Sequence, residues 1–117
     1  MELTSSADTI VVKKAAATNT TDPQCVVKFF EQSRLNGERM DVPDYQRTDV
    51  TGSAEVTVLS GPSSNTAGRR VVDKLWLYNT DAIQHDFYIG HATGGTTYRL
   101  KRVILDAGMS AEYSDEA

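Results

Sequence analysis

The feature that most constrains the fold is the last third of the chain, from Arg69 to Tyr113, where strand-like runs alternate with turn signals. Every residue of Leu75–Tyr78 is apolar or aromatic, which is typical of a central strand covered on both faces. From Ile83 to Ile89 apolar and polar residues alternate, as in a half-buried strand. The segments 79–81 and 93–95 are rich in residues that favour tight turns. We therefore predict an antiparallel β-meander over this region.

Strand-like segments also fill the rest of the chain. Alternating or β-branched residues predict strands over 9–12, 24–33 and 54–59, whereas 44–50 is ambiguous. Asn36-Gly37 is a strong hairpin signal, and we expect a short edge strand to return over 38–42. Loops are predicted over two segments rich in Thr, Ser, Asn, Gly or Pro, namely 15–22 and 60–70.

About eight strands and no helix predict an all-β fold, a single antiparallel β-sandwich of the jelly-roll type, with a barrel as the alternative. The 117 residues suit one domain, 1–117. Residues 1–8 are small and polar, and we expect them to form an arm that is flexible or ordered by a partner. At the other end, glycine is the third residue of Asp106–Met109, as a type II turn requires.

Composition excludes several classes of function. The formal net charge of -4 argues against a nucleic-acid partner, because phosphate binding relies on clustered Lys and Arg. Cys25 is the only cysteine, so neither an intramolecular disulfide nor a multi-cysteine metal site can form. No apolar run approaches the roughly 20 residues that span a bilayer, and the first residues lack the pattern of a signal peptide. We expect no membrane partner and no secretion signal.

The side chains that carry chemistry do not form a catalytic set. His85 has the parity of the apolar residues of its strand, whereas Asp86 points to the other face, so the two cannot act together. We predict that His85 is a hydrogen-bonded structural residue and that His91, at the strand end, is better exposed but has no partner for catalysis. Cys25 and Trp76 are expected in the core. Because no nucleophile, base and orienting group can be combined from these residues, we predict that the chain is not an enzyme. We also expect it to bind no cofactor and no metal.

Three cations lie close together near residue 100. With a period of two, Arg99 and Lys101 share one face of their strand, and Arg102 lies on the other. Charged residues on a solvated strand protect an edge against uncontrolled pairing. The alternative is a contact to an acidic partner surface.

Several motifs in the second half of the chain occur in a fixed succession. TGSAEVTVLSGPS leads into an alternating strand, RRVVDKLWLYNTDA follows a loop, TTYRLKRVILDAG follows a glycine-containing turn, and Glu112-Tyr113 closes the pattern. This succession, from about Thr51 to Tyr113, resembles that of small β-rich bacteriophage virion structural proteins. It covers about half of the chain.

The resemblance implies a non-enzymatic virion protein, assembled in the host cytoplasm and located on the capsid surface. Its implied role is that of a decoration or cement protein that binds and stabilises the shell of the major capsid protein or other virion proteins, as a homo-oligomer, trimer or dimer. A tail or fibre adaptor domain is the alternative. We expect partner contacts beside the short edge strand and on the charged strand, at Met40, Pro43, Tyr45, Arg99 and Lys101.

Two further classes of function stay open. A carbohydrate-binding β-sandwich would use exposed aromatic residues, for which the candidates are Tyr45, Tyr88 and Tyr98. A hydrolase has the least support, because two isolated histidines and one cysteine supply no nucleophile activated by a base.

Overall fold

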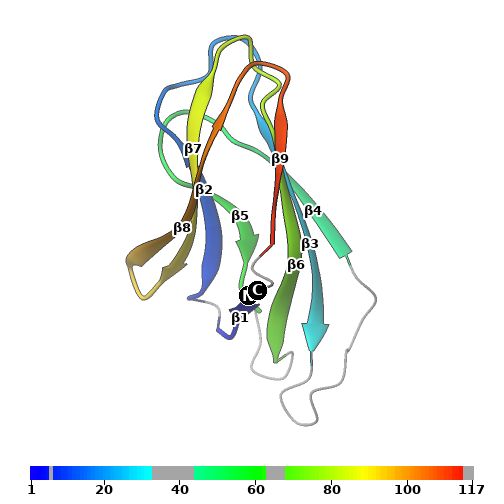
Figure 1. Ribbon diagram of the computed structural model, residues 1–117. Coiled ribbons are helices and arrows are strands. Elements are labelled where there is room, and N and C mark those ends of the chain that lie inside the picture. Colours follow the sequence, from blue (N-terminus) through cyan, green and yellow to red (C-terminus); the bar gives the residue numbers. More distant parts are fainter. Residues whose placement is uncertain (6, 33–43, 63–67, 115–117) are drawn as a thin grey trace.

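The computed structural model describes residues 1–5, 7–32, 44–62 and 68–114, and these residues form nine β-strands in two antiparallel sheets that pack face to face (Figure 1). The strands are β1 (Glu2–Leu3), β2 (Thr9–Lys14), β3 (Gln24–Gln32), β4 (Asp44–Asp49), β5 (Val56–Ser60), β6 (Arg69–Tyr78), β7 (His85–Thr93), β8 (Thr96–Leu105) and β9 (Ser110–Tyr113). The predicted all-β sandwich is confirmed. In the described part of the chain no helix is long and apolar enough to cross a membrane. The predicted Asn36-Gly37 hairpin and the strand over 38–42 lie outside the described residues.

The two sheets have different strand orders. Sheet A has the order β1-β6-β3-β4, with β9 paired to the second half of β6, and sheet B has the order β5-β2-β7-β8. Of the strands described, β3 with β4 and β7 with β8 are the consecutive strands that pair within one sheet. The other connections carry the chain from one sheet to the other.

The predicted meander is therefore wrong at its first junction. β6 pairs with β3 on one side and with β1 and β9 on the other, so no edge of β6 is open to β7. β7 pairs instead with β2 and β8, and the segment 79–84 crosses between the sheets. The β7–β8 hairpin is confirmed, and Gly94 and Gly95 turn it with φ angles of 57° and 84°. Gly108 (φ 79°) turns the chain into β9, where the Met109 N–H donates to Asp106 O at 3.0 Å.

The core lies between the inner faces of the two sheets. Alternate residues of β3 and β6, such as Cys25, Leu75 and Leu77, face Val12 and Phe87 of sheet B, and all five are nearly inaccessible to solvent. Burial of each large apolar side chain of this kind contributes about 1.5–3 kcal/mol. These contacts make the two sheets one packed unit.

Trp76 lies outside this core, which corrects the prediction that it packs inside. Its neighbours Leu75 and Leu77 point inward, so the period of two directs Trp76 to the outer face of sheet A, where it is half-buried. Apolar or aromatic residues at every position of Leu75–Tyr78 indicated cover on both faces, but of the described residues none forms a layer over the outer face of sheet A.

The buried carboxylate of Asp81 joins two crossing loops at one end of the sandwich, at the top of Figure 1. It accepts hydrogen bonds from the N–H groups of Asn19 and Thr20, both at 2.8 Å, and from His85 Nε2 at 2.6 Å. Burial alone would raise the pKa of Asp81, but the bonds from the Asn19 N–H, from His85 and from the Thr20 N–H outweigh it and hold the pKa well below its usual range. Asp81 therefore stays ionised.

We call this end of the sandwich the loop end; it comprises residues 15–23, 50–55, 79–84 and 106–109. The buried side chains of Asn79 and Lys14 also form hydrogen bonds here. The buried Asn79 amide donates from Nδ2 to Ile83 O (2.9 Å) and Leu105 O (2.8 Å). Lys14 is fully buried and donates from Nζ to Gly52 O. Desolvation lowers the pKa of Lys14, although Asp22 and Asp81 counteract part of this effect.

Replacement of Asn79 by alanine tests the role of the loop end. Asn79→Ala leaves the Ile83 and Leu105 carbonyls without these donors, and we expect the free energy of unfolding to fall by about 3 kcal/mol. Urea denaturation measures this change. Gln84→Ala is the control, since its bond to Asp106 is exposed and its loss should change stability by less than about 0.5 kcal/mol. Equal effects of both variants would contradict the role of Asn79.

Part of the N-terminal segment, where we expect an arm that is flexible or ordered by a partner, forms a short strand with its own chain. Glu2 and Leu3 pair with Val71 and Arg70 of β6, beside the residues of β6 that pair with β9, and Leu3 is fully buried in the core. The Asp8 carboxylate accepts hydrogen bonds from the Thr4 N–H (2.9 Å) and the Ser5 N–H (3.2 Å). Most of this segment is therefore part of the fold.

Gly61 allows the N-terminal segment to pack closely against it, because a side chain at this position would collide with backbone atoms of that segment. A Cβ added at Gly61 would collide with the carbonyl oxygen of Ser5 and lie 2.6 Å from that of Asp8. We expect Gly61→Ala to lower the free energy of unfolding by about 3 kcal/mol in urea denaturation, because backbone atoms must move. Ser53→Ala, in an exposed loop, is the control. A loss below about 0.5 kcal/mol in Gly61→Ala would show that residues 1–8 do not pack here.

The acid stability of the protein should depend on Asp8. A hydrogen bond from Thr93 and those from Thr4 and Ser5 lower the pKa of Asp8 from 3.8 to about 2, although burial counteracts them. Because the pKa is lower in the folded state, Asp8 stabilises the fold above pH 3.8, and this contribution is lost as the pH falls toward about 2. We expect Asp8→Asn to be less stable than the unmodified protein at neutral pH, with a difference that shrinks over this range. A difference independent of pH would contradict this assignment.

Candidate functional site

The reactive side chains of the described residues are structural in their placement. The Cys25 thiol is fully buried, and desolvation raises its pKa to about 12, so it is no nucleophile at neutral pH. His85 is buried and bonded to Asp81, as the sequence predicted for a structural histidine. His91 lies near the other end of β7, with Nε2 3.8 Å from the Asp8 carboxylate. No group of three or more His, Cys, Asp or Glu side chains in the described ranges is placed to hold a metal ion.

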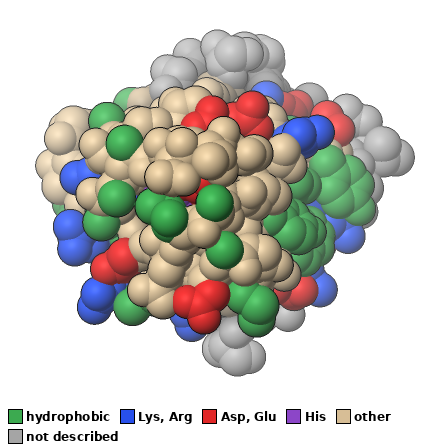
Figure 2. All heavy atoms as spheres, turned by 90° about the horizontal axis from the view of Figure 1, so that it is seen from above, with side chains coloured by type: hydrophobic (Ala, Val, Ile, Leu, Met, Phe, Trp, Pro, Cys, Tyr) green, Lys and Arg blue, Asp and Glu red, His purple; other side chains and the backbone are tan. Residues whose placement is uncertain are grey.

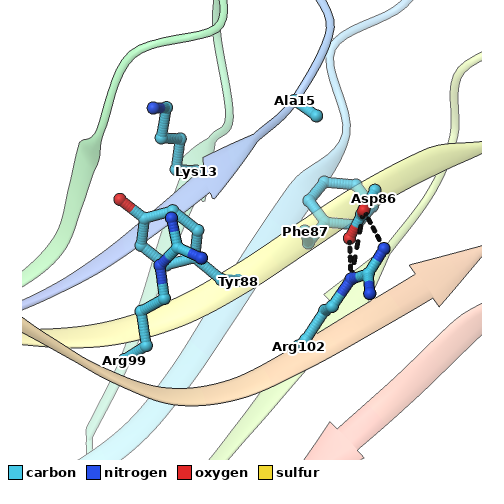
Figure 3. Close-up of a pocket in the computed structure, with 7 residues that line it drawn as sticks. All are labelled: Lys13, Ala15, Asp86, Phe87, Tyr88, Arg99 and Arg102. Atoms are coloured by element: carbon cyan, nitrogen blue, oxygen red, sulfur yellow. Dashed lines mark hydrogen bonds and ion pairs between the residues drawn. The ribbon is translucent and has the colours of Figure 1, made fainter.

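A groove of about 340 Å³ lies on the outer face of sheet B (Figure 3). Strands β2, β7 and β8 supply most of its lining, and we call it the basic groove. Its lining residues are Lys13, Ala15, Asp86, Phe87, Tyr88, Arg99 and Arg102. Three of the seven carry a positive charge and one carries a negative charge, so the groove is basic although the chain as a whole is acidic.

A β-bulge brings the two arginines of the groove to the same face. Tyr88 pairs with Arg102 and Ile89 with Lys101, but Gly90 pairs with Arg99, so Leu100 is an extra residue in β8. Because of the extra residue, the side chains of β8 on one side of the bulge face the sheet surface opposite to the one that a strict period of two predicts. The prediction that Arg99 shares a face with Lys101 is therefore wrong, because Arg99 lies with Arg102 in the groove and Lys101 does not.

Gly90 makes the close packing beside this bulge possible. A Cβ at Gly90 would lie 2.8 Å from Thr97 Cγ2 and 3.3 Å from Val11 Cγ2. Thr97 and Val11 flank Gly90 on β8 and β2, and their methyl groups occupy the space where its side chain would be. A glycine inside a strand is a known signal of a bulge, and it was the available sequence signal for this site.

Tyr88 is held in place from two sides. The guanidinium carbon of Arg99 lies 4.4 Å from the centroid of the ring, and Lys13 Nζ lies 6.0 Å from it. The hydroxyl donates to Glu55 Oε2 at 2.6 Å, and Glu55 also accepts a bond from Thr97 Oγ1 at 3.0 Å. Burial and the bond to Glu55 raise the pKa of Tyr88, so the hydroxyl stays protonated.

Arg102 and Asp86 form a bidentate ion pair at the other side of the groove. Arg102 Nε lies 3.0 Å from Asp86 Oδ1, and Nη2 lies 2.6 Å from Oδ2. Arg102 thereby lowers the pKa of Asp86. The ion pairs among the described residues include neither Lys13 nor Arg99. These two cations are available to a ligand.

A second exposed surface lies on the outer face of sheet A. The rings of Tyr45 and Trp76 stack above β3, with centroids 6.5 Å apart and planes at 26°. Trp76 Nε1 donates to Glu112 Oε2 at 3.2 Å, which fixes the indole. Val26 and Tyr78 extend the patch, and we call these four residues the aromatic face. Figure 2, seen from the loop end, shows hydrophobic side chains gathered on the flank where sheet A lies.

The residues predicted to contact a partner do not form one surface. Tyr45 is 59% exposed on β4 in sheet A, whereas Arg99 and Lys101 lie on β8 in sheet B. Met40 and Pro43 lie outside the described residues. The sequence contained no signal that would separate the predicted contacts in this way, because sheet membership depends on distant pairing.

The three tyrosines considered for sugar binding are also apart. Tyr88 lies under Arg99 on the outer face of sheet B, and Tyr45 lies on the opposite sheet. Tyr98 pairs with His91 near the turn of the β7–β8 hairpin, at the end of sheet B opposite the loop end. The described structure therefore contains no aromatic platform shared by these rings.

Comparisons with protein-family models, with curated proteins and with solved structures returned no match.

Proposed function

We propose that this chain is a non-enzymatic virion structural protein, a capsid decoration or cement protein that binds the shell of the major capsid protein and stabilises it. The observation that supports a binding role is the aromatic face. The identity of the partner comes from the resemblance to phage virion proteins. A trimer or dimer on the capsid surface is part of the same proposal.

The aromatic face has the composition of a protein contact. Tyr45 is 59% exposed and Tyr78 is 38% exposed, beside the half-buried Trp76. Contiguous exposed aromatic residues on a folded domain are typical of interaction sites, and Trp and Tyr are enriched among the residues that dominate binding energy. Burial of these rings against a partner would remove their apolar surface from water.

The sandwich presents this face with little freedom of movement. The aromatic face lies on β3, β4 and β6, and the inward residues of β3 and β6 are core residues such as Cys25, Val27 and Leu77. Because the indole of Trp76 is bonded to Glu112 and stacked on Tyr45, little side-chain entropy is lost on binding. On a shell with many equivalent positions, repeated contacts of moderate affinity stabilise the whole particle.

Purified particles with and without this protein test the proposal. Imaging should show added density on the shell when the protein is present, whereas density on the tail alone would support the adaptor alternative. A protein absent from shell and tail would contradict a virion role.

The contact surface is tested by cosedimentation with particles that lack the protein. We expect Tyr45→Ala to weaken binding about 30-fold, as for loss of about 2 kcal/mol at a central interface residue. Tyr98→Ala is a matched control, because Tyr98 is 57% exposed and lies away from the aromatic face. Equal binding of the two variants would show that the aromatic face is not the contact surface.

A further inference from the structure

We propose that the basic groove binds the carboxylate groups of an acidic segment of a partner protein. The groove is on sheet B and the aromatic face is on sheet A, so the two surfaces point away from each other across the core. This second binding site goes beyond the proposed function and does not depend on a virion role.

Charge supplies the first argument. Lys13, Arg99 and Arg102 line the groove, and Asp86 is the one carboxylate in its lining. Asp86 is already engaged by Arg102, so an anionic side chain that enters the groove meets the cations of Lys13 and Arg99. Figure 3 shows these two side chains around the Tyr88 ring, with the Asp86–Arg102 pair beside them.

Geometry favours a carboxylate as the ligand. Guanidinium groups bind carboxylates through two parallel N–H bonds, and Arg102 already binds Asp86 in this way. Arg99 lies over the ring of Tyr88, which is itself held by Glu55. The guanidinium of Arg99 is therefore positioned before a ligand arrives, and its planar edge can donate to an incoming carboxylate.

The size and surroundings of the groove favour a short protein segment over a polyanion. A volume of about 340 Å³ corresponds to about ten water molecules, enough for one or two acidic side chains. The Tyr88 ring and the methylene stems of Lys13 and Arg99 offer apolar surface to the methylene groups of a glutamate. An extended polyanion would pass beyond the groove onto a chain whose net charge is -4.

A titration with a short peptide tests this site. The probe is a capped peptide of three glutamates between two glycines, and the comparison peptide has glutamine in place of glutamate. We expect millimolar binding of the glutamate peptide, with chemical-shift changes at the backbone amides of Tyr88 and Arg99, and weaker binding at higher salt.

Two single substitutions in β8 distinguish binding in the groove from a nonspecific effect of the positive charge of the protein. Arg99→Gln should weaken binding of the glutamate peptide about tenfold, as for loss of a charge-assisted contact. Lys101→Gln removes the same charge two residues away but outside the groove, and should change binding less than about twofold. Thermal unfolding checks that both variants are folded.

Four results would overturn the proposal. The first is that Arg99→Gln and Lys101→Gln weaken binding of the glutamate peptide equally, and the second is that the glutamine peptide binds as tightly as the glutamate peptide. The third is that no chemical shifts change up to about 10 mM peptide. The fourth is that inorganic phosphate or a heparin oligosaccharide binds more tightly than the glutamate peptide. Tyr45→Ala should leave peptide binding unchanged, so failure at the groove and failure at the aromatic face can be distinguished.

Discussion

The rest of the fold depends on the buried carboxylate of Asp81. It binds backbone N–H groups of the β2–β3 loop and the His85 ring at the start of β7, and so joins the segments that carry the chain between the two sheets. A charge in the interior is tolerated because several donors replace its water. This anchor sets where β7 begins, and β7 in turn carries Asp86, Tyr88 and Gly90 into the outer face of sheet B.

Two chemically different surfaces follow from this arrangement. Sheet A presents stacked aromatic rings, and sheet B presents a groove lined by the cations of Lys13 and Arg99, while the packed core between them holds both in fixed relation. A protein with such faces on opposite sides is suited to join neighbouring partners. On a capsid, the proposed location, bridging contacts of this kind resist the loss of single subunits.

Local patterns predicted the strands better than their arrangement. The alternation in 24–33 and 54–59 and the turns near Gly94 and Gly108 agree with the structure because each depends on neighbouring residues. The meander and the buried Trp76 were wrong for one reason. Whether a strand pairs with its successor or changes sheet, and whether a face is covered, depends on residues far away in sequence.

The sequence by itself determined an all-β fold with strands near these positions, a buried Cys25 and a structural His85, because a period of two records which side of a strand is apolar. The tertiary structure alone decided that β6 and β7 lie in different sheets and that Arg99 joins Arg102 in one groove. One extra residue at Leu100 reverses the alternation of β8. Its position is set by pairing with β7 and by the space beside Gly90, which are contacts between separate strands.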